Sequence, residues 1–147
     1  MAVNTAREHY LTPNPDGEDI IIANTYAKAN ESIMIGLHTA FKAVGESGSD
    51  VVLISNAPDG QVTHYLLGIF GRTTRANLPL TSRVPENVRH VIVYSEYHDI
   101  AGRVYIEQSD KVSFTDKWSD VVAALEGWNK PDARVAVLPS SEIQYFA

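Results

Sequence analysis

The chain has 147 residues, of which 44% are hydrophobic and 20% charged, and its net charge is −6. This length and composition predict one globular domain, spanning residues 1–147, with a single hydrophobic core. The negative charge disfavours binding to nucleic acid or to an anionic membrane, and the absence of cysteine excludes disulfides and thiolate chemistry. No stretch has the apolar length of a signal core or a membrane span, so we expect a cytoplasmic protein.

Continuous apolar runs predict strands that are buried on both faces, as in a parallel sheet. The four clearest runs span residues 20–23, 51–54, 91–93 and 135–138, and a weaker run at 104–106 predicts a fifth strand. Parallel strands need long crossover connections, so helices are expected between them.

Three stripes of apolar residues at helical spacing predict the helices that cover this sheet. They span residues 33–44, 62–70 and 118–128, and the third has Ser113 or Thr115 as a candidate N-cap. Strands that alternate with helices indicate an α/β domain. We therefore expect a Rossmann-like domain of three layers, with a mainly parallel sheet of four to five strands and helices on both faces.

Polar segments follow the predicted strands, at residues 24–30, 55–61 and 95–98. Ligands of parallel sheets bind beyond the carboxyl ends of the strands, so a site is expected at this edge. Asn30 also suits the N-cap of the following helix, and Asp59 suits an ordinary turn. The candidate substrate-binding residues are Asn24, Tyr26, Lys28, Asn30, Asn56, Asp59 and Gln61.

His64 is the candidate catalytic residue, because it lies in the first turn of a predicted helix just beyond a strand end, where an imidazole can exchange protons near neutral pH. As a solvent-facing helix residue it would have no such role. His38 adjoins the first apolar stripe and is expected to be a partly buried packing residue. The five histidines lack paired spacing, and no glycine-rich loop follows the first strand, so the domain alone is expected to bind neither metal nor nucleotide.

Two stretches carry a resemblance to a known family. Residues 19–31 read Asp-Ile-Ile-Ile-Ala-Asn-Thr-Tyr-Ala-Lys-Ala-Asn-Glu, and residues 50–64 read Asp-Val-Val-Leu-Ile-Ser-Asn-Ala-Pro-Asp-Gly-Gln-Val-Thr-His. Both resemble the C-terminal domain of the LarA-type nickel-pincer lactate racemase family. The resemblance covers nearly the whole chain but only part of a larger, two-domain family member.

The resemblance implies an isomerase: a racemase or epimerase of 2-hydroxy acids that works by hydride transfer to a nickel-pincer nucleotide. An N-terminal domain, in the same or a separate chain, would hold this cofactor, and the present domain would close over it and hold the small-molecule substrate. The domain would be inactive alone. Met34 and Leu37 stand near positions where the family has a substrate-holding Gln and Lys, which indicates a divergent member. Its substrate would be another 2-hydroxy acid or a related hydroxylated compound.

Two other hypotheses stay open. One is a non-catalytic module that binds a small anion or assembles with a protein partner, since no complete catalytic set can be read from the sequence. Residues 72–90 are predicted to be a long loop that could contact such a partner through Arg72, Arg75, Arg83 and Arg89. The other is a small α/β enzyme that is complete in itself, which the lack of a nucleotide loop, a thiol or a metal pair disfavours.

Overall fold

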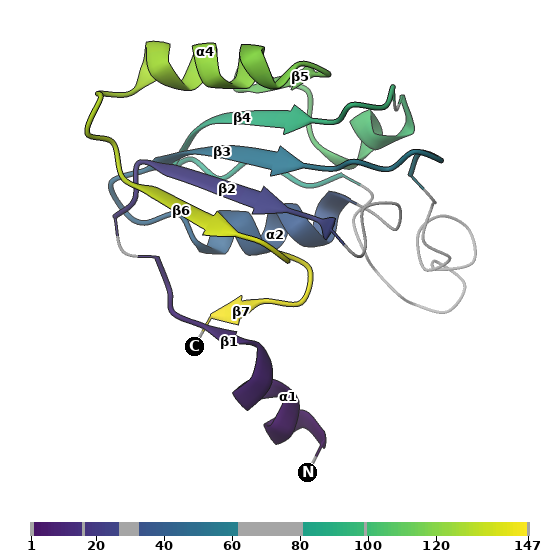
Figure 1. Ribbon diagram of the computed structural model, residues 1–147, viewed down its shortest axis with the longest axis vertical. Coiled ribbons are helices and arrows are strands. Elements are labelled where there is room, and N and C mark those ends of the chain that lie inside the picture. Colours follow the sequence, from purple (N-terminus) through teal and green to yellow (C-terminus); the bar gives the residue numbers. More distant parts are fainter. Residues whose placement is uncertain (1, 16, 27–32, 62–80, 99, 147) are drawn as a thin grey trace.

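The structure is a computed structural model that describes residues 2–15, 17–26, 33–61, 81–98 and 100–146. A 3₁₀ helix, η2, accompanies the helices and strands (Figure 1). In chain order the elements are α1 (Ala2–Tyr10), β1 (Leu11–Thr12), β2 (Ile20–Asn24), α2 (Ile33–Lys42), β3 (Ser49–Ile54), β4 (Val88–Tyr94), η2 (Ala101–Tyr105), β5 (Val112–Thr115), α4 (Trp118–Trp128), β6 (Val135–Leu138) and β7 (Tyr145–Phe146).

Five of the strands form one sheet in the order β5-β4-β3-β2-β6, and every pairing in it is parallel. α2 and α4 lie on opposite sides of this sheet (Figure 1). The predicted α/β fold, with a parallel sheet and helices on both faces, is therefore confirmed. Among the described helices, none is long and apolar enough to cross a membrane.

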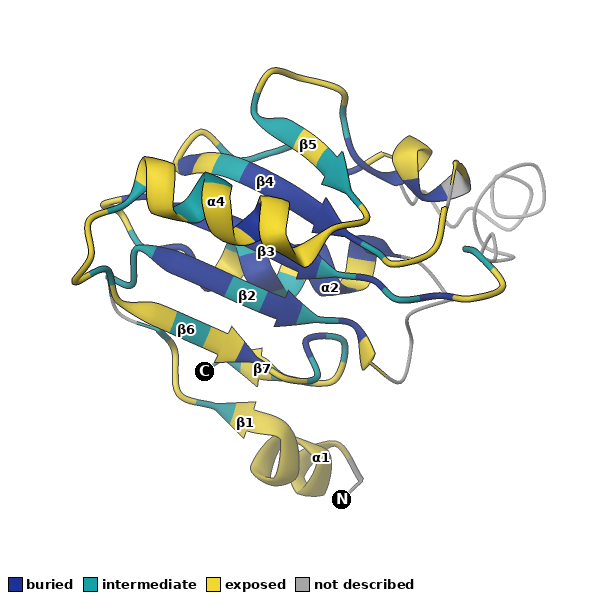
Figure 2. Cartoon of the chain, turned by 45° about the horizontal axis from the view of Figure 1, so that its top comes forward, coloured by how far each residue is buried: buried dark blue, intermediate teal, exposed yellow. Residues whose placement is uncertain are grey.

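Alternating side chains of the central strands divide the core into two parts. Val51 and Leu53 belong to a cluster with Leu37 of α2, whereas Val52 belongs to a second cluster with Val121 of α4. Successive residues of a strand point to opposite faces of the sheet, so a strand covered on both sides must be apolar throughout. Figure 2 shows β2, β3 and β4 as the most deeply buried strands.

The fifth strand of the sheet is not the predicted one. Residues 101–105 form η2, and Ile106 makes only an isolated bridge to Ser82, so the prediction of a strand at 104–106 is wrong. A run of three apolar residues is too short for the spacing of its buried side chains to distinguish a strand from a helix. Val104 is exposed, whereas Tyr105 and Ile106 are buried in the core. The place of the predicted strand, at one edge of the sheet, is taken by β5. This strand is only partly buried and contains two hydroxyl residues.

Because the fifth strand is β5, α4 also begins differently from the prediction. Ser113 and Thr115 lie in β5, and the residue at the N-cap of α4 is Lys117, so the predicted N-cap is wrong. Thr115 still contributes to the turn before the helix, because its Oγ1 accepts a hydrogen bond from the Lys117 backbone N–H.

Some predicted features lie partly or wholly outside the described residues. The predicted helix at 62–70 and residues 72–80 of the predicted loop fall there. Within the described part, Arg89 is a residue of β4 rather than of a loop. His38 is exposed rather than partly buried, although its Nε2 lies 3.2 Å from Oγ of the buried Ser82. Desolvation of the ring, followed by the charge of Lys42, lowers the pKa of His38, which favours a neutral imidazole in this contact.

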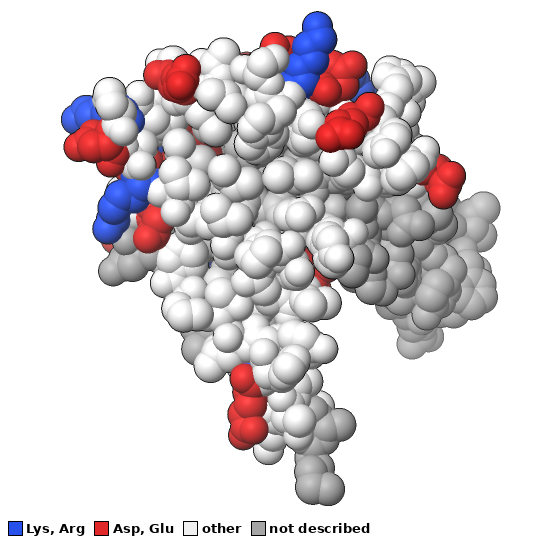
Figure 3. All heavy atoms as spheres, in the orientation of Figure 1, with Lys and Arg blue, Asp and Glu red and all other residues white. Residues whose placement is uncertain are grey.

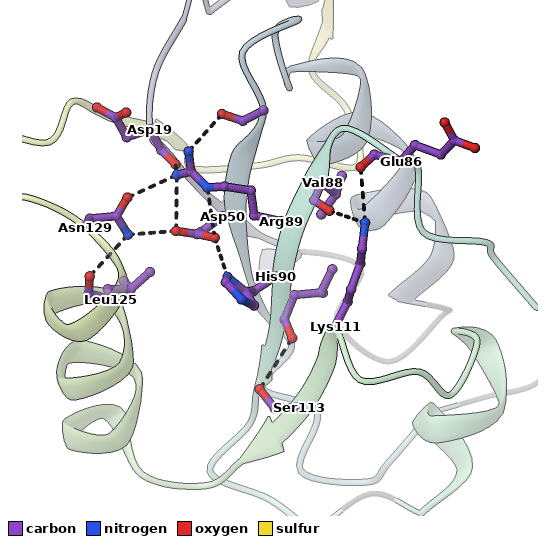
Figure 4. Close-up of polar contacts among 12 residues, drawn as sticks. Asp19, Asp50, Glu86, Val88, Arg89, His90, Lys111, Ser113, Leu125 and Asn129 are labelled. Carbon is purple, nitrogen blue, oxygen red and sulfur yellow. Dashed lines mark hydrogen bonds and ion pairs between the residues drawn. The ribbon is translucent and has the colours of Figure 1, made fainter.

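A buried carboxylate joins several elements at the amino ends of the strands (Figure 4). Asp50 is 1% exposed, and its two oxygens accept hydrogen bonds from His90 Nδ1 at 2.8 Å and Asn129 Nδ2 at 2.7 Å. Arg89 Nη2 lies 3.2 Å from Asp50 and also donates to the Asp19 backbone oxygen at 2.8 Å. This cluster connects β3, β4, the segment before β2 and the end of α4.

The contacts of Asp50 determine its charge state. Burial alone would raise the pKa of Asp50, but hydrogen bonds from Arg89, Asn129 and His90, together with the charge of Arg89, outweigh burial and lower it. A carboxyl group with a lowered pKa stabilises the fold above its ordinary pKa of about 3.9. That contribution is lost as the pH falls from this value through the lowered pKa.

Asp50→Asn should lower the free energy of unfolding by about 1–3 kcal/mol at pH 7, because buried donors lose their charged acceptor. The loss should stay below that of a fully buried ion pair, since Arg89 is 39% exposed and water can solvate it. Urea unfolding should give the same difference at pH 7 and pH 5 and a smaller one at pH 3. Asp110→Asn, at an exposed position, is the control; an equal loss in both variants would contradict this account.

Candidate functional site

The first two predicted segments meet at the carboxyl edge of the sheet. β2 and β3 pair in parallel so that Asn24 lies opposite Ile54, and the strands end side by side. Thr25 continues the contact: its backbone N–H and its Oγ1 both donate to the Ile54 carbonyl oxygen at 3.0 Å. The adjacency expected from a parallel sheet is therefore present.

Three of the predicted substrate-binding residues hold the loops of this edge together. Asn24 Oδ1 accepts a hydrogen bond from the Tyr26 backbone N–H at 3.0 Å, and Asn56 Oδ1 accepts one from Glu96 at 2.9 Å. Gln61 Oε1 accepts one from the backbone N–H of Ile33, the first residue of α2, at 3.0 Å. These contacts give the amides a positioning role, and substrate binding by them stays a prediction.

Tyr26 and Asp59 are the other described candidates. Tyr26 has a φ of 26° and a side chain that is 73% exposed. A residue with a Cβ is strained in this region, and such strain is often found at functional sites. Asp59 is exposed and precedes Gly60, whose φ of 75° completes the predicted turn. Lys28, Asn30 and His64 lie outside the described residues.

A pocket of about 380 Å³ lies at the carboxyl ends of the next strands along the sheet, β3, β4 and β5. Ser55, Ser95 and Thr115, which end or directly follow these strands, line it together with Ile33 at the start of α2. Further polar side chains come from the loop after β4, from η2 and from the start of α4. They are Tyr97, His98, Arg103, Asp116 and Asp120.

Backbone hydrogen bonds continue the sheet into the base of this pocket. Ser55 N–H donates to the Tyr94 carbonyl oxygen at 2.9 Å, and Ser95 N–H donates to that of Thr115 at 3.1 Å. The Ser95 hydroxyl accepts a hydrogen bond from the Tyr97 backbone N–H at 3.2 Å. The serines are thus fixed next to one another, on neighbouring strands.

Arg103 and Asp120 are held on the walls of the pocket. The guanidinium carbon of Arg103 lies 4.7 Å from the centroid of the Phe114 ring, a cation–π contact. Asp120, in the first turn of α4, accepts hydrogen bonds from Thr115 Oγ1 at 3.2 Å and Ser119 Oγ at 3.4 Å. A carboxylate at this end of a helix interacts favourably with the helix dipole.

Acidic groups also affect a tyrosine beside the pocket. Burial, a hydrogen bond from Tyr94 to Glu96, and the charges of Glu96 and Asp116 raise the pKa of Tyr94. The phenol therefore stays neutral near pH 7.

The described residues contain no group of three or more His, Asp or Glu side chains that could hold a metal ion. The donors of the pocket do not fit a nickel ion for the same reason, because His98, Asp116 and Asp120 do not form such a group.

Neither the known protein families nor the curated proteins include a match to this chain. The resemblance to the LarA-type family therefore stays a prediction.

The sequence does not predict the wall of the pocket that contains Arg103, Asp116 and Asp120, because the predicted fifth strand lies at the wrong residues. With a strand at 104–106, Arg103 appears to precede a strand rather than line the carboxyl edge. Asp116 and Asp120 likewise appear as ordinary charges beside a helix N-terminus. The signal that could have found them is the polar segment after Phe114, which resembles the strand ends at 55–61 and 95–98.

Gln61→Ala should lower the free energy of unfolding by about 1 kcal/mol, because the first backbone N–H of α2 loses its acceptor. Gln61→Glu keeps an acceptor at the helix N-terminus, where a negative charge is favourable, so it should be as stable as the unmodified chain to within about 0.5 kcal/mol. Denaturant unfolding at pH 7 compares the two variants. Equal destabilisation by both would show that the amide acts through another contact.

Proposed function

We propose that this domain binds a small 2-hydroxy acid, or a related hydroxylated acid, at the carboxyl edge of its sheet, as the substrate-holding part of a LarA-like racemase or epimerase. The observation that carries the proposal is the pocket beyond β3, β4 and β5, which combines a guanidinium, an imidazole, carboxylates and hydroxyl groups. Ligands of open parallel sheets bind in this place.

The lining suits the two functional groups of such an acid. Arg103 offers planar N–H donors that match a carboxylate. The hydroxyl groups of Ser95 and Tyr97 can donate to or accept from a substrate hydroxyl, whereas that of Thr115 donates to Asp120 and can only accept. His98 lines the same pocket, and an imidazole can give or take a proton near neutral pH.

The proposed role of this chain is limited to holding the acid. The cofactor of the proposed enzyme is assigned to another part of it. This division agrees with the resemblance, in which the cofactor belongs to the preceding domain.

A complementation experiment tests the proposal. The chain is mixed with the cofactor-loaded N-terminal domain of a LarA-type enzyme, and racemisation of a panel of 2-hydroxy acids is followed by chiral chromatography. Activity above that of either part alone is expected, and Arg103→Gln should reduce it at least tenfold, mainly through KM. Lys42→Gln, at an exposed position outside the pocket, should leave activity unchanged. No activity on any acid, with the cofactor loaded, would contradict the proposal.

An assembly module is the second candidate, and the amino-terminal arm favours it. α1 extends away from the body of the domain, and its side chains from residue 3 to residue 10 are all exposed (Figures 1 and 2). Val3 is 65% exposed and Tyr10 40% exposed. A nine-residue helix is not stable alone in water, so contact with another surface would stabilise it.

The body offers an uncharged surface for such a contact. Charged side chains are sparse over the middle of the face in Figure 3, where β2 and β6 lie in the same view of Figure 1. Val135 and Val137 of β6 are 47% and 61% exposed.

If assembly is the function, light scattering should find oligomers that Val3→Ser and Val137→Ser dissociate, and the chain should have no affinity for hydroxy acids. A monomer at micromolar concentration would contradict this candidate.

A further inference from the structure

We infer that the pocket accepts a polyhydroxylated carboxylic acid, with Arg103 holding the carboxylate and Asp116 and Asp120 accepting hydrogen bonds from additional hydroxyl groups. The inference rests on the proposed function and makes its substrate class more specific. It depends on three features of the described residues: the fixed position of Arg103, the unmatched charges around it, and the size of the pocket.

Arg103 is placed by its side chain and by its backbone. The guanidinium carbon lies 4.7 Å from the centroid of the Phe114 ring, and this cation–π contact holds the group at the wall of the pocket. Gln108 Nε2 donates to the Arg103 carbonyl oxygen at 2.9 Å and to that of Ile106 at 3.2 Å, which holds the end of η2. Tyr105 and Ile106, two and three residues after Arg103, are each 1% exposed and anchor this segment in the core.

The charges of the pocket are not matched among themselves. Arg103 is the only lysine or arginine among the described lining residues, and no ion pair in the described part of the chain joins it to Asp116 or Asp120. Asp120 is held by two hydroxyl groups, whereas no described residue donates a hydrogen bond to Asp116. The pocket thus offers one cationic donor group and two carboxylates that can only accept.

This combination limits the ligand. A simple anion would bind Arg103 but would be repelled by the two carboxylates, unless it also brought donors to them. Hydroxyl groups meet this need, and the Ser95 hydroxyl, which accepts from the Tyr97 backbone N–H, can donate to one of them. The volume of about 380 Å³ lies in the lower range of small-molecule sites, and a three-carbon acid such as lactate would fill only part of it.

Binding measurements on the full chain test the inference with four probes. Gluconate carries both features, lactate carries the acid with a single hydroxyl, sorbitol carries the hydroxyls without the acid, and serine carries the acid with one hydroxyl and an ammonium. Calorimetry or ligand-observed NMR should find gluconate bound at least tenfold more tightly than each of the other three, since sorbitol lacks the carboxylate and lactate and serine lack the additional hydroxyl groups.

Variants test which residues recognise the carboxylate and which recognise the additional hydroxyl groups. Arg103→Gln should abolish the preference for gluconate over sorbitol, whereas Asp116→Ala should abolish the preference for gluconate over lactate. Lys42→Gln and Asp110→Asn, both at exposed positions outside the pocket, should leave all four affinities unchanged. Thermal unfolding of each variant confirms that the fold is intact.

The outcomes separate this inference from the proposed function. If lactate binds as tightly as gluconate and Arg103→Gln weakens both, the polyhydroxylated class is wrong and the hydroxy-acid site stands. If serine binds most tightly, or if none of the acids binds, the inference and the proposed function both fail.

Discussion

Parallel pairing of five strands is the constraint on which the rest of the structure depends. It requires a crossover between successive strands, so helices cover the sheet on both faces and the central strands must be apolar throughout. It also brings the carboxyl ends of all the strands to the same edge of the sheet. Side chains of the loops that follow the strands can contact a ligand there. The pocket beyond β3, β4 and β5 follows from this arrangement.

The amino ends and the carboxyl ends of the strands have different roles. At the amino edge, Asp50 is enclosed by Arg89, His90 and Asn129, so the charges there satisfy one another and hold the elements together (Figure 4). At the carboxyl edge, Arg103, Asp116 and Asp120 line one pocket without such pairing among the described residues. Matched buried charges favour a structural role, whereas unmatched charges around a pocket favour ligand binding. This contrast is the physical basis for placing the candidate site at the carboxyl edge.

How far the sequence could predict this molecule depended on how strongly burial constrains each segment. The strands buried on both faces, such as 20–24 and 49–54, read as continuous apolar runs and were found close to their true bounds. Edge strand β5 is half exposed and mixed in composition, so the short apolar run at 104–106 was preferred to it. The same error hid Arg103 and Asp116. The amides Asn56 and Gln61 were correctly placed at the edge, but their hydrogen bonds to Glu96 and Ile33 depend on contacts distant in sequence, which no local pattern reveals.

The central claim is that a hydroxylated acid binds at the carboxyl edge of the sheet, and mapping the bound ligand tests it most directly. Backbone amide NMR spectra of the chain can be recorded during titration with gluconate. The account predicts that the largest shifts fall on residues 95–98, 102–103 and 114–120, around the pocket. Shifts confined to the amino edge around Asp50 and His90, or no saturable shift at all, would contradict it.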